Sequence, residues 1–459
     1  MSKLAKALTA AAGNAGESLY VEDVFSTYLY TGNNSTQTID NGIDLDGEGG
    51  LVWFKRRSTS RTHVLIDTER GKTSYLQSNE TVPAETGITN TITSFNSDGF
   101  SISDQQDING NAETVASWTF RKAEKFFDVV TYTGNGVAGR TVAHNLGSTP
   151  ACMIVKRTNA SQGWAVYHVG MDATNPENWM MRLNATDARF DLTPSRWNDT
   201  APTSTDFTLS DNDEVNGNGD TYVAYLFASD AGGFGDDGDE SIIKCGSYTG
   251  NGTSSNYIDF GFEPQWFLVK NATSGSTPWL ILDNMRGWPA APASSQQELT
   301  ANTSNAESTG SNVGITSTGI GITTSATPIN KSGDNYIYIA IRRPMKTPES
   351  GTEVFSPVAY TGNGSADRRI DTDIVSDMVF WKSRSNGTDW KSASMLAGSS
   401  RALTPNTAGS ESSVPNYYIT DYDNKGFNFG TSDSSYNTNT WTYVVHAFKR
   451  ATGFFDVVA

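Results

Sequence analysis

The stretch Tyr132-Thr133-Gly134-Asn135-Gly136 is one of four nearly identical copies in this 459-residue chain. The other copies begin at Tyr30, Tyr248 and Tyr360, so the period is roughly 100–115 residues. A period of that length is the size of a domain and is much longer than the repeat of a solenoid protein. The repeat therefore predicts a string of similar domains, each with its own core, joined end to end.

The same order of predicted strands follows each copy of this pentapeptide. An apolar strand that ends in lysine comes first, at 51–55, 153–156, 266–270 and 378–382. A second strand follows at 63–67, 164–168 and 279–283, then a hairpin with a tight turn, clearest at 97–100 and 424–427, and then a closing strand at 116–120, 222–227, 336–340 and 441–445. Alternating polarity and enrichment in aromatic and β-branched residues predict an all-β protein of four tandem antiparallel β-sandwich modules.

The repeat also predicts the domain boundaries. We expect an N-terminal anchor at 1–20, modules at 21–125, 126–239, 240–352 and 353–450, and a C-terminal strand at 451–459. The anchor contains the only good helical pattern, Lys3–Ala12. Phe126–Val130 opens the second module and recurs as Phe454–Val458 with no module after it, so we expect each copy to pair with the preceding module or, at the C-terminus, with another subunit. Segments 230–240 and 344–352 have the composition of linkers.

Composition excludes several classes of protein. The net charge of −17 disfavours binding to nucleic acid or to an anionic membrane. The sequence contains no run of about 20 apolar residues, so it predicts no membrane-spanning helix. Aromatic residues make up 11% of the chain, which is too many for a disordered protein. The two cysteines, Cys152 and Cys245, are expected to be buried and to take no part in redox chemistry or metal binding.

The repeated pattern resembles a known family. It reads YTGNG, then a short segment such as Ile39-Asp40, then an apolar strand ending in lysine, then a strand leading to Asp-x-x-Arg-Gly. Over residues 21–450 it is similar to repeats of unassigned function in virion proteins of tailed bacteriophages, especially marine ones. The resemblance implies concanavalin A-like, laminin-G-like jelly-roll modules. It also implies a homo-oligomeric tail, fibre or capsid-surface component, located in the virion and held to other virion proteins through its N-terminus.

No catalytic motif stands out. GxSxG, HExxH and P-loop patterns are absent from the sequence, and no GxGxxG lies between a predicted strand and a predicted helix. The four histidines fall at different points of the repeat, so we expect no enzymatic activity and no cofactor. The acidic stretches 211–214 and 236–240 offer oxygen ligands to Ca²⁺, but neither fits an EF-hand loop. Solvated, turn-forming acids are the favoured interpretation, and a structural Ca²⁺ is the alternative.

Two kinds of residue are weak candidates for ligand binding. The Asp-x-x-Arg-Gly element places Asp67 beside Arg70 in the first module and Asp283 beside Arg286 in the third. Such a pair would hold sugar hydroxyls or, in the favoured structural interpretation, would close the turn that ends a strand while Gly takes a positive φ. Trp197 and Trp288 lie outside the repeated strands and are expected to be exposed for stacking on a ligand.

These observations lead to a functional expectation. We expect a tail fibre or tail appendage that presents its modules to host-surface glycans, with no nucleic acid as partner. The alternatives are a capsid decoration or other purely architectural virion protein, a glycan depolymerase or esterase, and a secreted adhesin.

Overall fold

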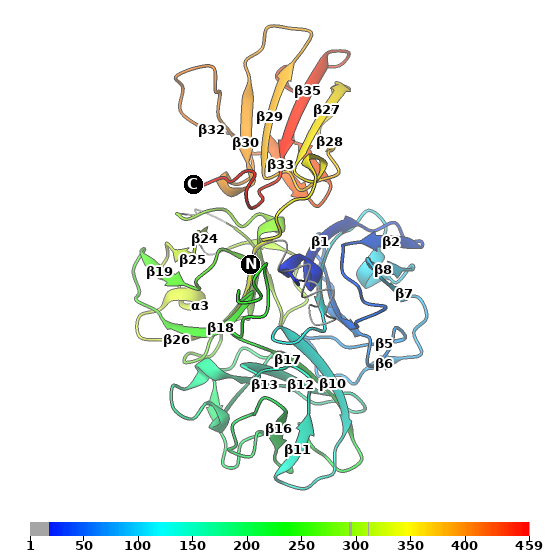
Figure 1. Ribbon diagram of the computed structural model, residues 1–459, viewed down its shortest axis with the longest axis vertical. Coiled ribbons are helices and arrows are strands. Elements are labelled where there is room, and N and C mark those ends of the chain that lie inside the picture. The colour runs from blue at the N-terminus through cyan, green and yellow to red at the C-terminus, as the bar shows by residue number, and fades with distance from the viewer. Residues whose placement is uncertain (1–17, 293–295, 311, 459) are drawn as a thin grey trace.

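The fold is all-β, and four larger antiparallel sheets follow one another along the chain (Figure 1). The computed structural model describes residues 18–292, 296–310 and 312–458. The predicted helix Lys3–Ala12 and most of the predicted anchor lie outside these residues. Units 1 to 4 are defined here as residues 21–125, 126–239, 240–352 and 353–450.

Each unit contains a larger antiparallel sheet built around its first and last strands. The larger sheets have the orders β1-β9-β3-β4, β10-β17-β12-β13-β14-β15, β18-β26-β20-β21-β22-β23 and β27-β35-β29-β30. Their strands in unit 1 are β1 (Phe25–Thr31), β3 (Gly50–Arg56), β4 (Val64–Asp67) and β9 (Thr114–Arg121). In unit 2 they are β10 (Phe127–Thr133), β12 (Cys152–Arg157), β13 (Trp164–His168), β14 (Trp179–Arg182), β15 (Phe190–Asp191) and β17 (Thr221–Phe227). In unit 3 they are β18 (Ile243–Thr249), β20 (Pro264–Asn271), β21 (Leu280–Asp283), β22 (Gln297–Thr300), β23 (Ser308–Thr309) and β26 (Asn335–Arg342). In unit 4 they are β27 (Phe355–Thr361), β29 (Met378–Ser383), β30 (Lys391–Ser394) and β35 (Thr442–Phe448).

Smaller sheets complete the sandwiches. They contain β2 (Gln37–Asp40), β7 (Ile92–Asn96) and β8 (Gly99–Ile102); β11 (Arg140–Ala143) and β16 (Asp206–Leu209); β19 (Asn256–Asp259), β24 (Val313–Thr316) and β25 (Gly319–Ile322); and β28 (Arg368–Asp371), β33 (Ile419–Asp423) and β34 (Gly426–Phe429). Short pairs are β5 (Ser74–Tyr75) with β6 (Glu85–Thr86) and β31 (Arg401–Ala402) with β32 (Ser412–Ser413). The hairpins predicted at 97–100 and 424–427 are confirmed as the turns of β7–β8 and β33–β34.

Helices are short connections. They are η1 (Val21–Asp23), α2 (Gln106–Asn109), η2 (Val169–Met171), η3 (Pro176–Asn178), η4 (Asn284–Arg286), α3 (Thr327–Asn330), η5 (Gly351–Glu353) and η6 (Met395–Ala397). In the described part of the chain, none of them has the length or apolar character to cross a bilayer.

The repeated pentapeptide ties the two ends of each unit together. In unit 1, the Tyr30 hydroxyl donates to the Ile108 carbonyl and the Asn33 amide donates to the Asn109 side chain. A Cβ on Gly32 would overlap the carbonyl oxygen of Gly110, so only glycine allows this approach. The same three features recur in units 2, 3 and 4 at Tyr132, Tyr248 and Tyr360 and the residues that follow them. The pentapeptide is therefore a structural clasp.

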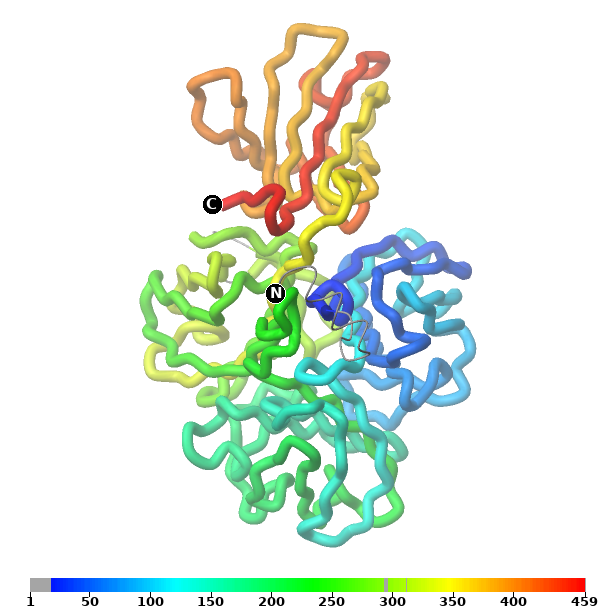
Figure 2. Tube along the Cα trace, in the orientation of Figure 1, coloured from blue at the N-terminus to red at the C-terminus, as the bar shows by residue number. Residues whose placement is uncertain are grey.

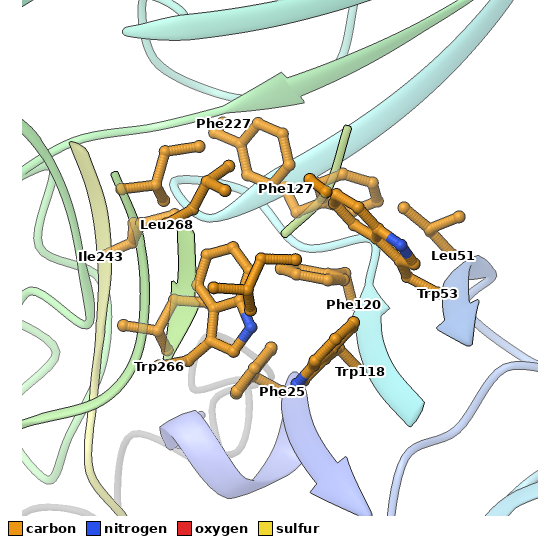
Figure 3. Packing of buried hydrophobic residues seen from close by; sticks show 14 of the residues in the cluster. Phe25, Leu51, Trp53, Trp118, Phe120, Phe127, Phe227, Ile243, Trp266 and Leu268 are labelled. Atoms are coloured by element: carbon orange, nitrogen blue, oxygen red, sulfur yellow. The ribbon is translucent and has the colours of Figure 1, made fainter. Parts of the chain in front are cut away.

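Units 1 to 3 close into a ring around a shared core, which differs from the predicted end-to-end string (Figures 1 and 3). Phe120 of unit 1 lies at the centre, with its ring 5.6 Å from Trp266 of unit 3 and 5.8 Å from Phe227 of unit 2. Units 1 and 3 also have separate cores between their own two sheets. The larger sheets of units 1 to 3 are thus buried on both faces, which explains why their strands read as continuous apolar runs.

The fourth unit lies outside the ring and is reached through residues 343–352 (Figure 2). Its β33–β34 turn packs on unit 1. There the Asn424 side chain accepts a hydrogen bond from the Leu29 amide and donates one to the Thr27 carbonyl. Against unit 3, Arg450 forms a paired salt bridge with Glu263, with both N–O distances 2.7 Å. The fourth unit therefore contacts the ring with one end of its sandwich.

Three expectations about the connections are wrong. The strand that opens unit 2, β10, pairs along its length with β17 of its own unit, and only the isolated bridge between Phe127 and Ala123 joins it to the preceding unit. Within the described residues, 454–458 form no strand: Phe455 bridges Ala451 and packs 5.3 Å from the Phe448 ring. Segment 230–240 is also no free linker, because Phe234 is buried and pairs with Glu240.

Candidate functional site: the seams of the ring

Strand register identifies equivalent positions in the four units. In each unit, one residue of the lysine-ending strand pairs with the same position of the closing strand. The pairs are Trp53 with Trp118, Ile154 with Tyr225, Leu268 with Ile339, and Phe380 with His446. The lysines that end the predicted strands, Lys55, Lys156, Lys270 and Lys382, are therefore equivalent. We call the contact between neighbouring units of the ring a seam, so that the ring has three seams.

The repeated lysine crosses each seam. Lys55 Nζ of unit 1 donates to the Ser304 carbonyl of unit 3 over 3.3 Å. Lys156 of unit 2 reaches Thr81 of unit 1 over 2.9 Å, and in the same way Lys270 of unit 3 donates to Thr186 of unit 2. Burial lowers the pKa of all three lysines to about 8, yet each stays protonated near neutral pH and binds backbone carbonyls. These lysines are structural donors that close the ring.

A second set of contacts comes from the residue that lies opposite each lysine on the neighbouring strand. In each case a side-chain ring nitrogen contacts a backbone carbonyl of the same neighbouring unit as the lysine does. His63 Nε2 contacts the Thr300 carbonyl, Trp164 Nε1 donates to that of Gln77, and Trp279 Nε1 donates to that of Arg182. A backbone bond follows at each seam: Glu307 N–H to Arg57 O, Ala84 N–H to Thr158 O, and Arg189 N–H to Ala272 O. These three kinds of contact, from the lysine, the ring nitrogen and the backbone, thus recur at every seam.

The Asp67–Arg70 pair lies in the seam between units 1 and 2. Arg70 Nε donates to Asp67 Oδ2 over 2.7 Å, and the Tyr225 hydroxyl of unit 2 donates to the same oxygen over 2.8 Å. Arg70 also donates to the Leu65 carbonyl and to Ser74. These bonds, together with the positive φ of Gly71, match the structural interpretation of this element.

The Asp283–Arg286 pair occupies the equivalent place in the seam between units 3 and 1. Asp283 Oδ2 accepts from Arg286 Nε over 2.6 Å and from Trp118 Nε1 of unit 1 over 2.9 Å. Arg286 Nη1 also donates to Glu307, which pairs in turn with Arg57 of unit 1. Burial by itself raises the pKa of Glu307, but the two guanidinium groups outweigh it and hold that pKa below its usual range.

The third seam has a different chemistry. His168 of unit 2 stands where units 1 and 3 have aspartate, and its Nε2 contacts the Tyr338 carbonyl of unit 3 over 3.0 Å. Met171 replaces the arginine, which explains why the Asp-x-x-Arg-Gly element is missing from unit 2. Burial lowers the pKa of His168 to about 4, so the imidazole is neutral near pH 7.

Clefts open at two of the seams. The first, between units 1 and 2, has a volume of about 680 Å³ and is lined by hydroxyl, amide and charged groups, including Glu69, Arg70, Thr131, Asn159 and Thr221. The second has a volume of about 440 Å³ and lies where unit 4 covers the seam between units 3 and 1, beside Arg286, Arg401 and Asp421. The structure thus places Arg70 and Arg286, two of the candidate residues, each on the wall of a cleft.

The expectation for the two tryptophans is wrong. Trp197 and Trp288 are fully buried. Trp197 Nε1 donates to the Trp179 carbonyl, and Trp288 Nε1 donates to the Val313 carbonyl. The loops that carry them fold back over their own units, so neither indole is available for stacking on a ligand.

The acidic stretches considered for Ca²⁺ are partly engaged. The Glu214 carboxylate is buried and binds Arg182 over 2.7 Å and Arg196 over 2.9 Å. Asp236 accepts from the Tyr20 hydroxyl. Among the described residues, no group of three or more His, Cys, Asp or Glu has the geometry of a metal site. Cys152 and Cys245 are free and buried, as expected.

The sequence comparison identifies a family without assigning a function. The family described as "Domain of unknown function (DUF7483)" matches residues 21–344 and 350–455. The chain belongs to the DUF7483 family. The two matched segments of DUF7483 divide within the connection between the ring and the fourth unit. No curated protein matches the sequence.

Sequence reasoning missed the residues that form the seams. The sequence pattern identifies Lys55, Lys156 and Lys270 only as strand ends, although a lysine that recurs after an apolar strand is a signal for a buried structural donor. The buried histidines His63 and His168 gave no such signal, because their equivalents in other units are tryptophan and aspartate.

Proposed function

We propose that this protein is a non-enzymatic structural component of a bacteriophage virion, a tail fibre or tail appendage that attaches to host-surface glycans. The observation that carries the proposal is how the repeated polar residues are used. The lysines and the Asp-Arg pairs of the ring are all engaged in seams, so the repeat serves to build a rigid body. The phage origin and the location in the virion come from the resemblance of the repeat.

The cleft between units 1 and 2 is the proposed glycan-binding surface. Thr131, Asn159 and Thr221 are exposed on its walls and offer hydroxyl and amide groups to sugar hydroxyls. Tyr132 stacks on Tyr222 at 5.1 Å and adds an aromatic surface. Weak binding at one such cleft per chain would be strengthened by many copies on one particle.

The proposal is tested by adsorption and binding assays. We expect the purified protein to bind host-surface polysaccharide and to compete with phage for adsorption. The double variant Thr131→Ala/Asn159→Ala should lose this competition, whereas the control Tyr257→Ala, which removes an exposed tyrosine of unit 3, should retain it. Equal competition by both variants would contradict the assignment of the cleft.

A second candidate, an architectural virion protein without a ligand, is favoured by the internal pairing of Arg70 and Arg286. Immunogold labelling separates the two. Label confined to the tail supports an attachment protein, and label over the whole capsid supports a decoration. Release of reducing ends from host polysaccharide would instead establish a glycan-degrading enzyme.

A further inference from the structure

The larger sheet of unit 4 has one face uncovered, and we call this the open face. Along β29, Val379, Trp381 and Ser383 are buried, whereas the alternate residues Met378 and Phe380 are partly exposed. The equivalent strands β3, β12 and β20 are buried almost throughout on both faces. The open face is therefore the face that units 1 to 3 bury in the shared core.

Single residues confirm this contrast. Leu403 is 46% exposed, whereas its counterparts Leu76, Met181 and Leu299 are at most 1% exposed. Phe380, Trp390, Pro405, His446 and Phe448 line an open hollow of about 400 Å³ on this face. A contiguous aromatic surface of this kind marks an interaction site.

The polar groups of a seam are also present on the open face. Lys382 Nζ donates to the Thr388 carbonyl of its own unit, as Lys156 donates to Gln162. Among the described residues, no carbonyl of another unit is bonded to Lys382 or to the Trp390 indole. At the other edge of the unit, the loop 403–411 is exposed or partly exposed. Its counterparts in the ring supply these missing acceptors.

The charges on the two edges of unit 4 are complementary. In the ring, Arg57 of unit 1 and Glu307 of unit 3 form a salt bridge of 2.9 Å across one of the three seams. Their equivalents in unit 4 are Arg384 and Glu411, both exposed. Glu411 pairs with Arg401 of its own unit, and both side chains are about one-third exposed, so this contact adds little stability.

We infer that the open face binds two further copies of this chain, so that three fourth units close into a ring like the one formed by units 1 to 3. The occupant is argued from the seams themselves. Each seam joins the lysine edge of one unit to the loop edge of the next, and such head-to-tail contacts close after three units. In the trimer, Lys382 and Trp390 donate to carbonyls near Ala408 and Thr404 of a neighbouring copy. The inference is independent of the proposed function.

The test is the oligomeric state of the full chain. Light scattering after gel filtration should give three times the chain mass of 49.5 kDa. Leu403→Asp should yield monomers, because three charges would be buried in the apolar interface. The matched control Val137→Asp, at a residue of unit 2 that is 60% exposed, should remain trimeric.

Charge reversal tests the seam independently of folding. Arg384→Glu and Glu411→Arg should each weaken the trimer, and the double variant should restore it, with circular dichroism unchanged throughout. A monomeric or dimeric wild-type protein at concentrations up to roughly 100 μM, above the dissociation constants of most specific interfaces, would overturn the inference. A trimer that persists in Leu403→Asp would overturn the assignment of the open face.

Discussion

Removing the Asp283 carboxylate is the sharpest test of how the ring is held together. Asp283 is fully buried and accepts from Arg286 and from Trp118 of a different unit. Breaking a buried ion pair by removing one partner costs about 3–5 kcal/mol. The orphaned indole N–H adds part of the roughly 1–3 kcal/mol that an unsatisfied buried donor costs. We therefore expect Asp283→Ala to lower the free energy of unfolding by about 4–5 kcal/mol.

The assay is urea unfolding followed by tryptophan fluorescence, since Trp118 lies in the affected seam. The control Glu349→Ala removes a partner of Lys346 in an exposed pair and should cost at most about 1 kcal/mol. Replacing both partners, in Asp283→Leu/Arg286→Met, should recover most of the loss, because no charge is then left unpaired at this position. A loss for Asp283→Ala no larger than that for the control would refute the structural role of the pair.

Three further predictions follow from buried positions. Burial lowers the pKa of His168 to about 4, so the unfolded chain binds a proton first on acidification and this residue destabilises the folded state as the pH falls. In urea unfolding, the free energy of unfolding of the wild type should therefore fall by about 3 kcal/mol more than that of His168→Gln between pH 6.5 and 4, and the loss left in the variant includes that from the buried His63, whose pKa is also lowered by burial. Gly134→Ala should lower the free energy of unfolding by about 1–3 kcal/mol, because the new Cβ would overlap the Gly217 carbonyl oxygen. Gly351→Ala places its Cβ in open space and should change thermal stability little. Leu299→Ala should lower the free energy of unfolding by about 2–5 kcal/mol, whereas Leu403→Ala should leave that of the diluted monomer almost unchanged. Equal losses of stability in the two variants would contradict the contrast between the buried and open faces.

The individual units could be predicted from the sequence because their signals are local. The strands and the hairpin at 97–100 follow from alternation and turn residues. The ring could not be predicted in this way, because the apolar run Leu51–Phe54 is compatible with burial on one face or on both.

The candidate site was predicted only in part. The pairing of Asp67 with Arg70 follows from a spacing of three residues across a turn. The burial of Trp197 and Trp288 depends on how two loops of different length fold back, and no periodicity encodes that path. Likewise, nothing adjacent to Asp283 in sequence indicates that its hydrogen-bond donor is Trp118, which lies 165 residues away.

Because one polypeptide encodes all three seams, each seam can evolve on its own. The positions Asp67, His168 and Asp283 show this divergence, with a tyrosine hydroxyl, a main-chain carbonyl and an indole as their respective partners. A substitution in a symmetric oligomer of identical subunits enters every interface at once. Within this single chain, a single amino-acid change can instead alter one junction while the other two stay as they were.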